Sequence, residues 1–173
     1  MEVRKSRSGA AFVALSNYII DRGGVVYGAG FKDGFKVCHK RATTFEQRDE
    51  FRGSKYVQSE IGDVFKQVKS DLRDERIVLF SGTPCQTSGL NSFVGKKLRK
   101  NLYLVDIVCH GTSSPKVWSD YLAHIEEMEG NRIVRLNFRN KSLFGWNAHK
   151  ETFEFENGET KWYRYRFYNA IVR

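Results

Sequence analysis

One stretch of the sequence has the pattern of a buried strand that runs directly into a helix. Residues 77–80 are a short apolar run rich in β-branched side chains, with charge before it and Ser81-Gly82 after it. Such a run is typical of a strand covered on both faces. Thr83 has a side chain that can cap a helix, and Pro84 suits the first helical position. The stretch therefore predicts an α/β fold, in which ligands bind beyond the carboxyl ends of the strands.

A second stretch repeats this pattern. Residues 102–108 form another apolar run, Cys109 and His110 follow it, and Ser114-Pro115 can open the next helix. If the two strands are parallel neighbours, both helix starts and the thiols of Cys85 and Cys109 meet at one edge of the sheet. The free N–H groups and the dipole of each helix start would favour an anionic ligand at that edge.

The rest of the chain predicts helices and strands on both sides of this unit. Asp33-Gly34 and Asn157-Gly158 are dipeptides of tight hairpins, so each should join two antiparallel strands. Apolar spacing predicts helices over residues 8–22, about 44–51 and about 59–72, and two more that start at Pro84 and Pro115. The inner faces of the last two are expected to carry Leu90, Phe93 and Val94, and Val117, Trp118, Tyr121, Leu122, Ile125 and Met128.

These patterns together predict a mixed α/β fold. We expect a largely parallel central sheet with flanking helices and a C-terminal antiparallel hairpin. Residues 1–173 are expected to form one domain, with a strand-rich part from about residue 131 to residue 173.

Two polar segments are further candidate ligand sites. Residues 52–59 combine small, hydroxyl, cationic and aromatic side chains just before a helix. Residues 138–146 combine cations with aromatic rings, which can stack on a planar ring and pair with phosphates. A solvated loop anchored by Trp146 explains the second segment somewhat better on residue types alone.

The charge of the chain favours an acidic partner. The 29 Lys and Arg outnumber the 20 Asp and Glu among 173 residues, which gives a formal charge of +9. Nucleic acid, a phosphorylated cofactor and a negatively charged protein all fit this charge, and so does a solvated basic face. No recognisable nucleic-acid module accompanies the basic groups, which are densest over residues 4–7, 96–100 and 161–173.

Cysteine content and hydropathy narrow the class of protein further. Cys38, Cys85 and Cys109 lie far apart, so they form no dense disulfide framework and no C-x-x-C metal pair, and we predict no metal ligands. No apolar run approaches the roughly 20 residues that span a bilayer. Residues 1–8 lack the apolar core of a signal peptide. We therefore expect a cytoplasmic protein that does not enter a membrane.

Six short motifs follow one another along the chain, over residues 7–9, 52–59, 81–86, 106–111, 114–118 and 137–146. In this order they resemble the coenzyme F420 hydrogenase/dehydrogenase beta-subunit family, a group of flavin- and iron–sulfur-containing oxidoreductase subunits.

This resemblance implies a domain that binds FAD and passes electrons or hydride between a soluble redox partner, such as coenzyme F420, and iron–sulfur centres. It implies that Cys109, His110 and Gly111 lie beside the redox centre. Cys85, Cys109 and His110 are then the candidate catalytic residues. The candidate FAD-binding residues are Ser8, Gly9, Ser54, Lys55, Tyr56, Gln58, Ser81, Gly82, Thr83, Pro84, Cys85, Gln86 and Gly111.

The sequence departs from the family pattern in two places. Gly9-Ala10 stands where the family has two glycines, and the added methyl group narrows the room for a ligand. The cysteine clusters that flank this region in the family are absent, and three dispersed cysteines cannot hold a four-cysteine cluster. We expect the chain to be part of a longer protein, or a version of the family without a complete cluster. Any complete iron–sulfur cluster would then lie elsewhere in that protein or in a partner.

Two other classes of function stay open. A non-catalytic module that binds nucleic acid or a protein partner would use the +9 charge and the Arg- and Tyr-rich residues 162–173. An enzyme with a cysteine nucleophile would need Cys85 opposite His110, because adjacent side chains such as Cys109 and His110 point in different directions on an extended backbone. Steep salt dependence of binding would identify the first class.

Overall fold

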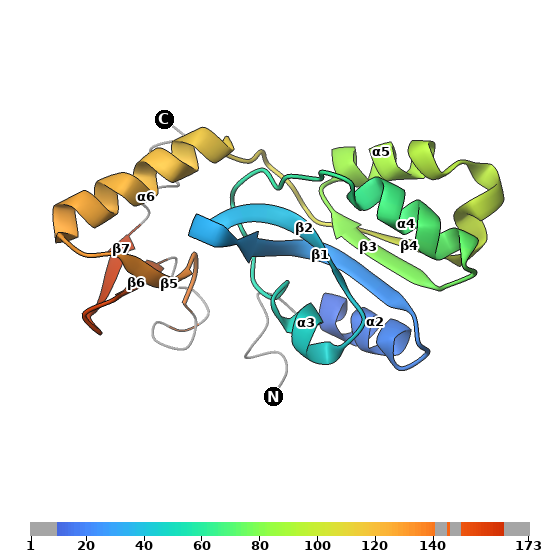
Figure 1. Ribbon diagram of the computed structural model, residues 1–173, viewed down its shortest axis with the longest axis horizontal. Coiled ribbons are helices and arrows are strands. Elements are labelled where there is room, and N and C mark those ends of the chain that lie inside the picture. Colours follow the sequence, from blue (N-terminus) through green and yellow to red (C-terminus); the bar gives the residue numbers. More distant parts are fainter. Residues whose placement is uncertain (1–9, 141–144, 146–149, 165–173) are drawn as a thin grey trace.

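A four-stranded sheet forms the centre of the computed structural model, which describes residues 10–140, 145 and 150–164. The order is β2-β1-β3-β4, with β3 parallel to both of its neighbours and β2 antiparallel to β1. This sheet confirms the predicted mixed, largely parallel architecture. The strands, drawn in Figure 1, are β1 (Val25–Lys32), β2 (Lys36–Ala42), β3 (Val78–Gly82) and β4 (Leu102–Asp106).

Helices cover both faces of the central sheet (Figure 1). Helices α2 (Ala11–Ile20) and α3 (Phe45–Asp49) lie on one face, and α4 (Val64–Arg73) and α5 (Pro84–Val94) lie on the other. Because strand side chains alternate between faces, Val25, Tyr27, Val78 and Phe80 pack towards α4 and α5, whereas Val26 and Leu79 pack with Ile19 of α2.

The predicted hairpin between β1 and β2 is present, with a short 3₁₀ turn, η1 (Asp33–Phe35), at its tip. Gly34 takes a left-handed φ of 66° there, which explains the Asp-Gly dipeptide. A second 3₁₀ segment, η2 (Lys96–Asn101), leads from α5 into β4.

The C-terminal part consists of one long helix packed on a second sheet. Helix α6 (Pro115–Glu129) is capped by Ser114, ends at a left-handed Gly130 and packs on an antiparallel sheet. That sheet has the order β5-β6-β7, from β5 (Ile133–Asn137), β6 (Lys150–Phe155) and β7 (Thr160–Arg164). The predicted C-terminal hairpin is β6–β7, and its turn contains Asn157-Gly158.

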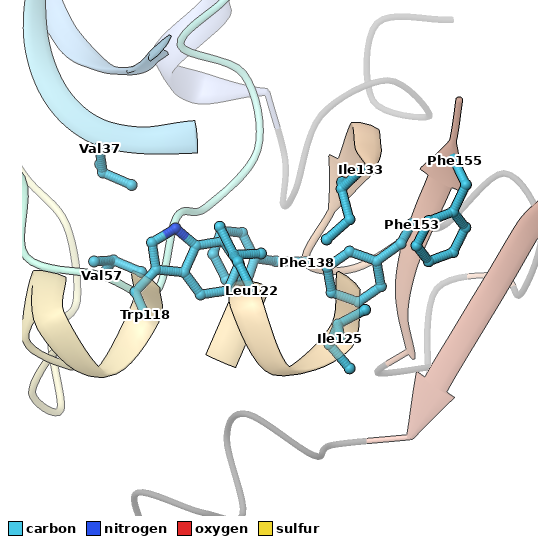
Figure 2. Close-up of a cluster of buried hydrophobic side chains, with 9 residues drawn as sticks. All are labelled: Val37, Val57, Trp118, Leu122, Ile125, Ile133, Phe138, Phe153 and Phe155. Carbon is cyan, nitrogen blue, oxygen red and sulfur yellow. The ribbon is translucent and has the colours of Figure 1, made fainter. Parts of the chain in front are cut away.

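Trp118 joins the two sheets. Its ring is buried in the cluster of Figure 2, between Val37 of β2 and Phe138 after β5, and its Nε1 donates to the carbonyl of Phe35 at 2.9 Å. The core around α6 and the second sheet therefore continues into the β1–β2 hairpin of the central sheet.

Three expectations are wrong in detail. Helix α4 begins at Val64 rather than near Ser59, because Glu60 pairs with β2 and Gly62 has a left-handed φ of 49°. The second apolar strand ends at Asp106, and Val108 is 89% exposed. Of the predicted inner-face residues, Phe93, Val117 and Met128 are exposed, whereas Leu90, Val94, Trp118, Leu122 and Ile125 are buried.

Some predictions lie outside the described residues. They concern the candidate site residues Ser8 and Gly9, the basic residues 4–7, the loop residues 141–144 and 146–149, and residues 165–173. Among the described helices, none has the length and apolar character needed to cross a bilayer.

Candidate functional site

The ends of β3 and β4 lie side by side at one edge of the central sheet. Gly82, the last residue of β3, is level with Asp106, the last residue of β4. The N–H of Ile107 donates to the carbonyl of Gly82 at 3.0 Å, and the Thr87 hydroxyl of α5 donates to the Asp106 carboxylate. The ends of the two apolar strands therefore meet at the carboxyl edge of β3 and β4, as expected for parallel neighbours. The start of α6 lies elsewhere, because Ser113 pairs with Val57.

The turn from β3 into α5 is tightly fixed. Thr83 is the residue before the helix, Pro84 is its first residue, and the Thr83 N–H donates to Oε1 of Gln86 at 3.1 Å. A β-carbon at Gly82 would lie 2.9 Å from Cε1 of Phe80 and 3.0 Å from Oε1 of Gln86, so a larger residue would displace the Gln86 amide. Glycine is required there for close approach rather than for backbone conformation.

The polar segment 52–59 reaches this edge through its last residues. Glu60 pairs with β2, because it accepts from the N–H of His39 and donates to the carbonyl of Val37, both at 2.9 Å. On the other side, Gln58 N–H donates to the carbonyl of Ser113 at 2.9 Å, and the Ser113 hydroxyl donates to the carbonyl of Tyr56 at 3.0 Å. Residues 56–60 therefore lie between β2 and the start of α6.

A chain of side chains links this segment to the turn before α5. Nε2 of Gln86 donates to the Ser59 hydroxyl at 2.9 Å, and that hydroxyl lies 2.8 Å from Nδ1 of His39. Nε2 of His39 lies 3.0 Å from the carbonyl of Ser81. The imidazole is buried and stacked on Phe80 with ring centroids 4.9 Å apart, and burial lowers the pKa of His39 below its usual value.

His39 was missed by reasoning from the sequence, and Ser59 lies in the predicted segment 52–59 but was not among the named site residues. The signal in the sequence was the strand alternation, which places His39 on the same face as Val37. A titratable side chain at an inward position must find hydrogen-bond partners inside the protein.

Lys55 is held within its own segment. Its ammonium group donates to the carbonyls of Glu50 and Arg52 at 2.9 and 3.1 Å, and it lies 5.7 Å from the ring centroid of Phe31. Burial lowers the pKa of Lys55 to about 8, although the charge of Glu50 acts in the opposite direction. Ser54 beside it is exposed.

The candidate catalytic residues lie on the open side of this edge. Residues 106–112 are exposed throughout, Gly111 has a φ of 113°, and Sγ of Cys109 accepts from its N–H at 3.4 Å. Cys85 is also exposed, with Sγ 3.1 Å from the Thr83 hydroxyl. In the described part of the chain, neither thiol contacts His110, and no group of three or more His, Cys, Asp or Glu residues is placed to hold a metal ion.

A separate hollow of about 460 Å³ opens over the second sheet, and none of the predicted site residues lines it. Asn137 of the last family-like motif does line it, together with Arg135, Leu136, Asn140, Thr152, Glu154 and Thr160.

Comparison with known proteins identifies a family and a similar fold. The sequence matches the family that describes the C terminus of the coenzyme F420 hydrogenase/dehydrogenase beta subunit, over residues 75–167, which is more than half of the chain. No curated protein matches it.

Among solved structures, the fold is similar to a chain in a xenon derivative of the F420-reducing [NiFe] hydrogenase complex from Methanosarcina barkeri. The TM-score is 0.63 and the sequence identity 18%, so the likeness concerns the fold. The alignment covers 97% of this chain and 58% of the other.

Proposed function

Because the chain belongs to the coenzyme F420 hydrogenase/dehydrogenase beta-subunit family, we propose that it is the FAD-binding part of an oxidoreductase subunit. One observation carries the proposal. Three segments that the sequence marks separately, residues 56–59, 81–86 and 107–113, meet at the carboxyl edge of β3 and β4. That edge is where α/β sheets bind nucleotide-like ligands.

The residues at this edge fit the pyrophosphate of FAD. Helix α5 has 11 residues, and its start points to this edge. Pro84 has no N–H, and among the described residues no group accepts from the N–H of Cys85. A free first-turn amide together with the positive end of a helix dipole suits a phosphate group.

Each candidate residue then has a physical role. FAD, when bound, supplies the transfer of electrons or hydride. Residues 81–86 form the turn at the FAD phosphates, where the N–H of Cys85 donates to a phosphate oxygen, and Lys55 contributes positive charge. His110, on the exposed loop after β4, exchanges a proton with the reacting group. Ser54, Tyr56, Gln58 and Gly111 complete the contacts, with Cys85 and Cys109 beside the flavin.

The proposal extends to partners. We infer a soluble redox carrier, such as coenzyme F420, on one side of the reaction and an iron–sulfur protein on the other. The similar chain belongs to a hydrogenase complex, and the present chain covers 58% of it. The complete electron path therefore needs groups that these 173 residues do not supply.

Titration of the purified chain with FAD tests the proposal. We expect a bound-flavin absorption spectrum and quenched flavin fluorescence. The pKa of Lys55, at about 8, leaves its ammonium group charged at pH 7 and neutral at pH 9. We expect FAD affinity to fall about tenfold over that range, which corresponds to the loss of one charge-assisted contact.

Two variants test whether Lys55 causes this pH dependence of FAD affinity. Lys55→Ala should bind FAD about tenfold more weakly at pH 7 and should lose most of the pH dependence. Lys97→Ala removes the same charge from an exposed position in η2. It should leave FAD affinity and its pH dependence unchanged. A chain that takes up no FAD at any pH would overturn the proposed function.

A further inference from the structure

We propose that His39 and Ser59 are positioning residues of the flavin site, which fix the turn before α5 by acting through Gln86. This inference rests on the proposed function for the identity of the ligand. The geometry that carries it is the chain of contacts from Thr83 through Gln86, Ser59 and His39 to Ser81.

The partners at its two ends give this chain a single direction. The Ser81 carbonyl can only accept, so Nε2 of His39 must carry the proton and donate to it. In the neutral imidazole, Nδ1 is then an acceptor, and the Ser59 hydroxyl donates to it. At the other end, the Thr83 N–H can only donate, so Oε1 of Gln86 accepts and its Nε2 donates to Ser59. Every donor therefore faces an acceptor.

The histidine is a firm anchor for this chain. Its side chain is 6% exposed and lies nearly parallel to Phe80, with an angle of 9° between the rings. Burial also favours its neutral form, which the directed chain requires. The imidazole therefore holds Ser59 in one orientation, and Ser59 holds the Gln86 amide.

This chain of hydrogen bonds affects the proposed ligand contacts. Both ends of the chain lie in the turn, at Ser81 and Thr83, so the chain closes a loop around residues 81–86. A turn fixed in advance presents the N–H of Cys85 to a phosphate without first losing conformational freedom. Without Ser59, the Gln86 amide would lose a partner, and ordering the turn would weaken ligand binding.

Substitution of Ser59 tests the inference with two readouts. The first is hydrogen exchange of the Thr83 amide in the ligand-free chain, and the second is FAD affinity. Ser59→Ala should speed exchange about tenfold and weaken FAD binding about tenfold, as expected for one lost hydrogen bond. Ser59→Thr keeps the hydroxyl and should restore both values. Ser88→Ala removes an exposed hydroxyl from α5 and serves as the control.

His39 provides an independent pair of variants. His39→Phe keeps the ring that stacks on Phe80 but removes both polar contacts, so it should behave like Ser59→Ala. His39→Gln keeps an N–H donor for Ser81 and should lie between His39→Phe and the unaltered chain. A melting curve for each variant shows that it folds, and the Ser59 pair decides the question if His39→Phe does not fold.

The outcomes separate this inference from the proposed function. Unchanged Thr83 exchange in Ser59→Ala overturns the inference, whatever the chain binds. Faster exchange with unchanged FAD affinity also overturns it, because the hydrogen bonds from His39 to Gln86 would then fix the turn without any effect on ligand binding. If the unaltered chain binds no FAD, the proposed function fails, and the exchange data still decide whether His39 and Ser59 fix the turn.

Discussion

At the start of α2, Ala10 adopts a left-handed backbone conformation with a φ of 65°. L-residues other than glycine pay about 1–2 kcal/mol for this conformation, since the β-carbon approaches the carbonyl oxygen that follows. Gly9-Ala10 departs from the two glycines that the family resemblance leads us to expect, and Ala10 carries the structural cost of that departure. Glu75 has a similar φ of 59° after α4.

We expect Ala10→Gly to raise the free energy of unfolding by about 0.5–1 kcal/mol, because relief of the left-handed strain exceeds the added freedom of the unfolded chain. Urea titration at pH 7 measures the change. Ala14→Gly, in the exposed interior of the same helix, should lower stability by about 1 kcal/mol. Loss of stability in both variants would contradict this interpretation of Ala10.

At the scale of elements, Asp71 ties α4 to the central sheet. Its side chain is 9% exposed, accepts from the Tyr27 hydroxyl of β1 at 2.6 Å, and pairs with Arg41 of β2 at 2.7 and 2.9 Å. Burial alone raises the pKa of Asp71, but the hydrogen bonds from Arg41 and Tyr27 outweigh it and leave the pKa below its usual value.

We expect Asp71→Asn to lower the free energy of unfolding at pH 7 by about 2 kcal/mol, because the Tyr27 hydroxyl and the Arg41 guanidinium, which is 36% exposed, would lose their carboxylate partner. A carboxyl group with a lowered pKa stabilises the fold above its unfolded-state pKa, and this contribution is lost as pH falls through its folded-state pKa. The gap between the variant and the unaltered chain should therefore close below about pH 4.

Denaturant titrations at several pH values measure that gap. Asp74→Asn, an exposed carboxyl at the end of the same helix, is the matched control and should change stability by less than about 0.5 kcal/mol. A gap that stays constant down to pH 2 would show that the Asp71 charge is not the cause.

Local patterns in the sequence predicted the elements well where the chemistry is local. The caps and prolines at Thr83-Pro84 and Ser114-Pro115 mark the starts of α5 and α6, and Gly130 marks the end of α6. The apolar run 77–80 predicted β3, because a strand covered on both faces needs no alternation.

Tertiary contacts decide what the sequence could not predict. Residues 59–63 have helical spacing, yet Glu60 pairs with β2 instead. The chain from Gln86 to His39 was out of reach for the same reason, since His39 and Ser81 are 42 residues apart. The candidate ligand edge could be predicted, whereas the side chains that support it could not.

At the scale of the whole molecule, β4 is an edge strand with exposed apolar side chains. Among the described residues it pairs with β3 alone, and its apolar residues Tyr103 and Leu104 are 51% and 36% exposed. An unpaired strand edge with apolar side chains favours pairing with another chain.

We expect the purified chain to associate as its concentration rises, and Tyr103→Lys to reduce that association because a charged edge resists strand pairing. Sedimentation velocity over a concentration series measures the effect. Val117→Lys changes an apolar residue of similar exposure on α6 and should have little effect. An equal effect from both variants would assign the association to general surface hydrophobicity.

The contacts around Ser59 also bear on the order in which the molecule forms. The candidate site joins Ser59 to Gln86 across 27 residues and Tyr56 to Ser113 across 57. Long loops must close before such contacts stabilise anything, so these contacts form late in folding. A chain emerging from the ribosome has its first hairpin early, but it has no complete ligand edge until Ser113 is free to reach back to Tyr56.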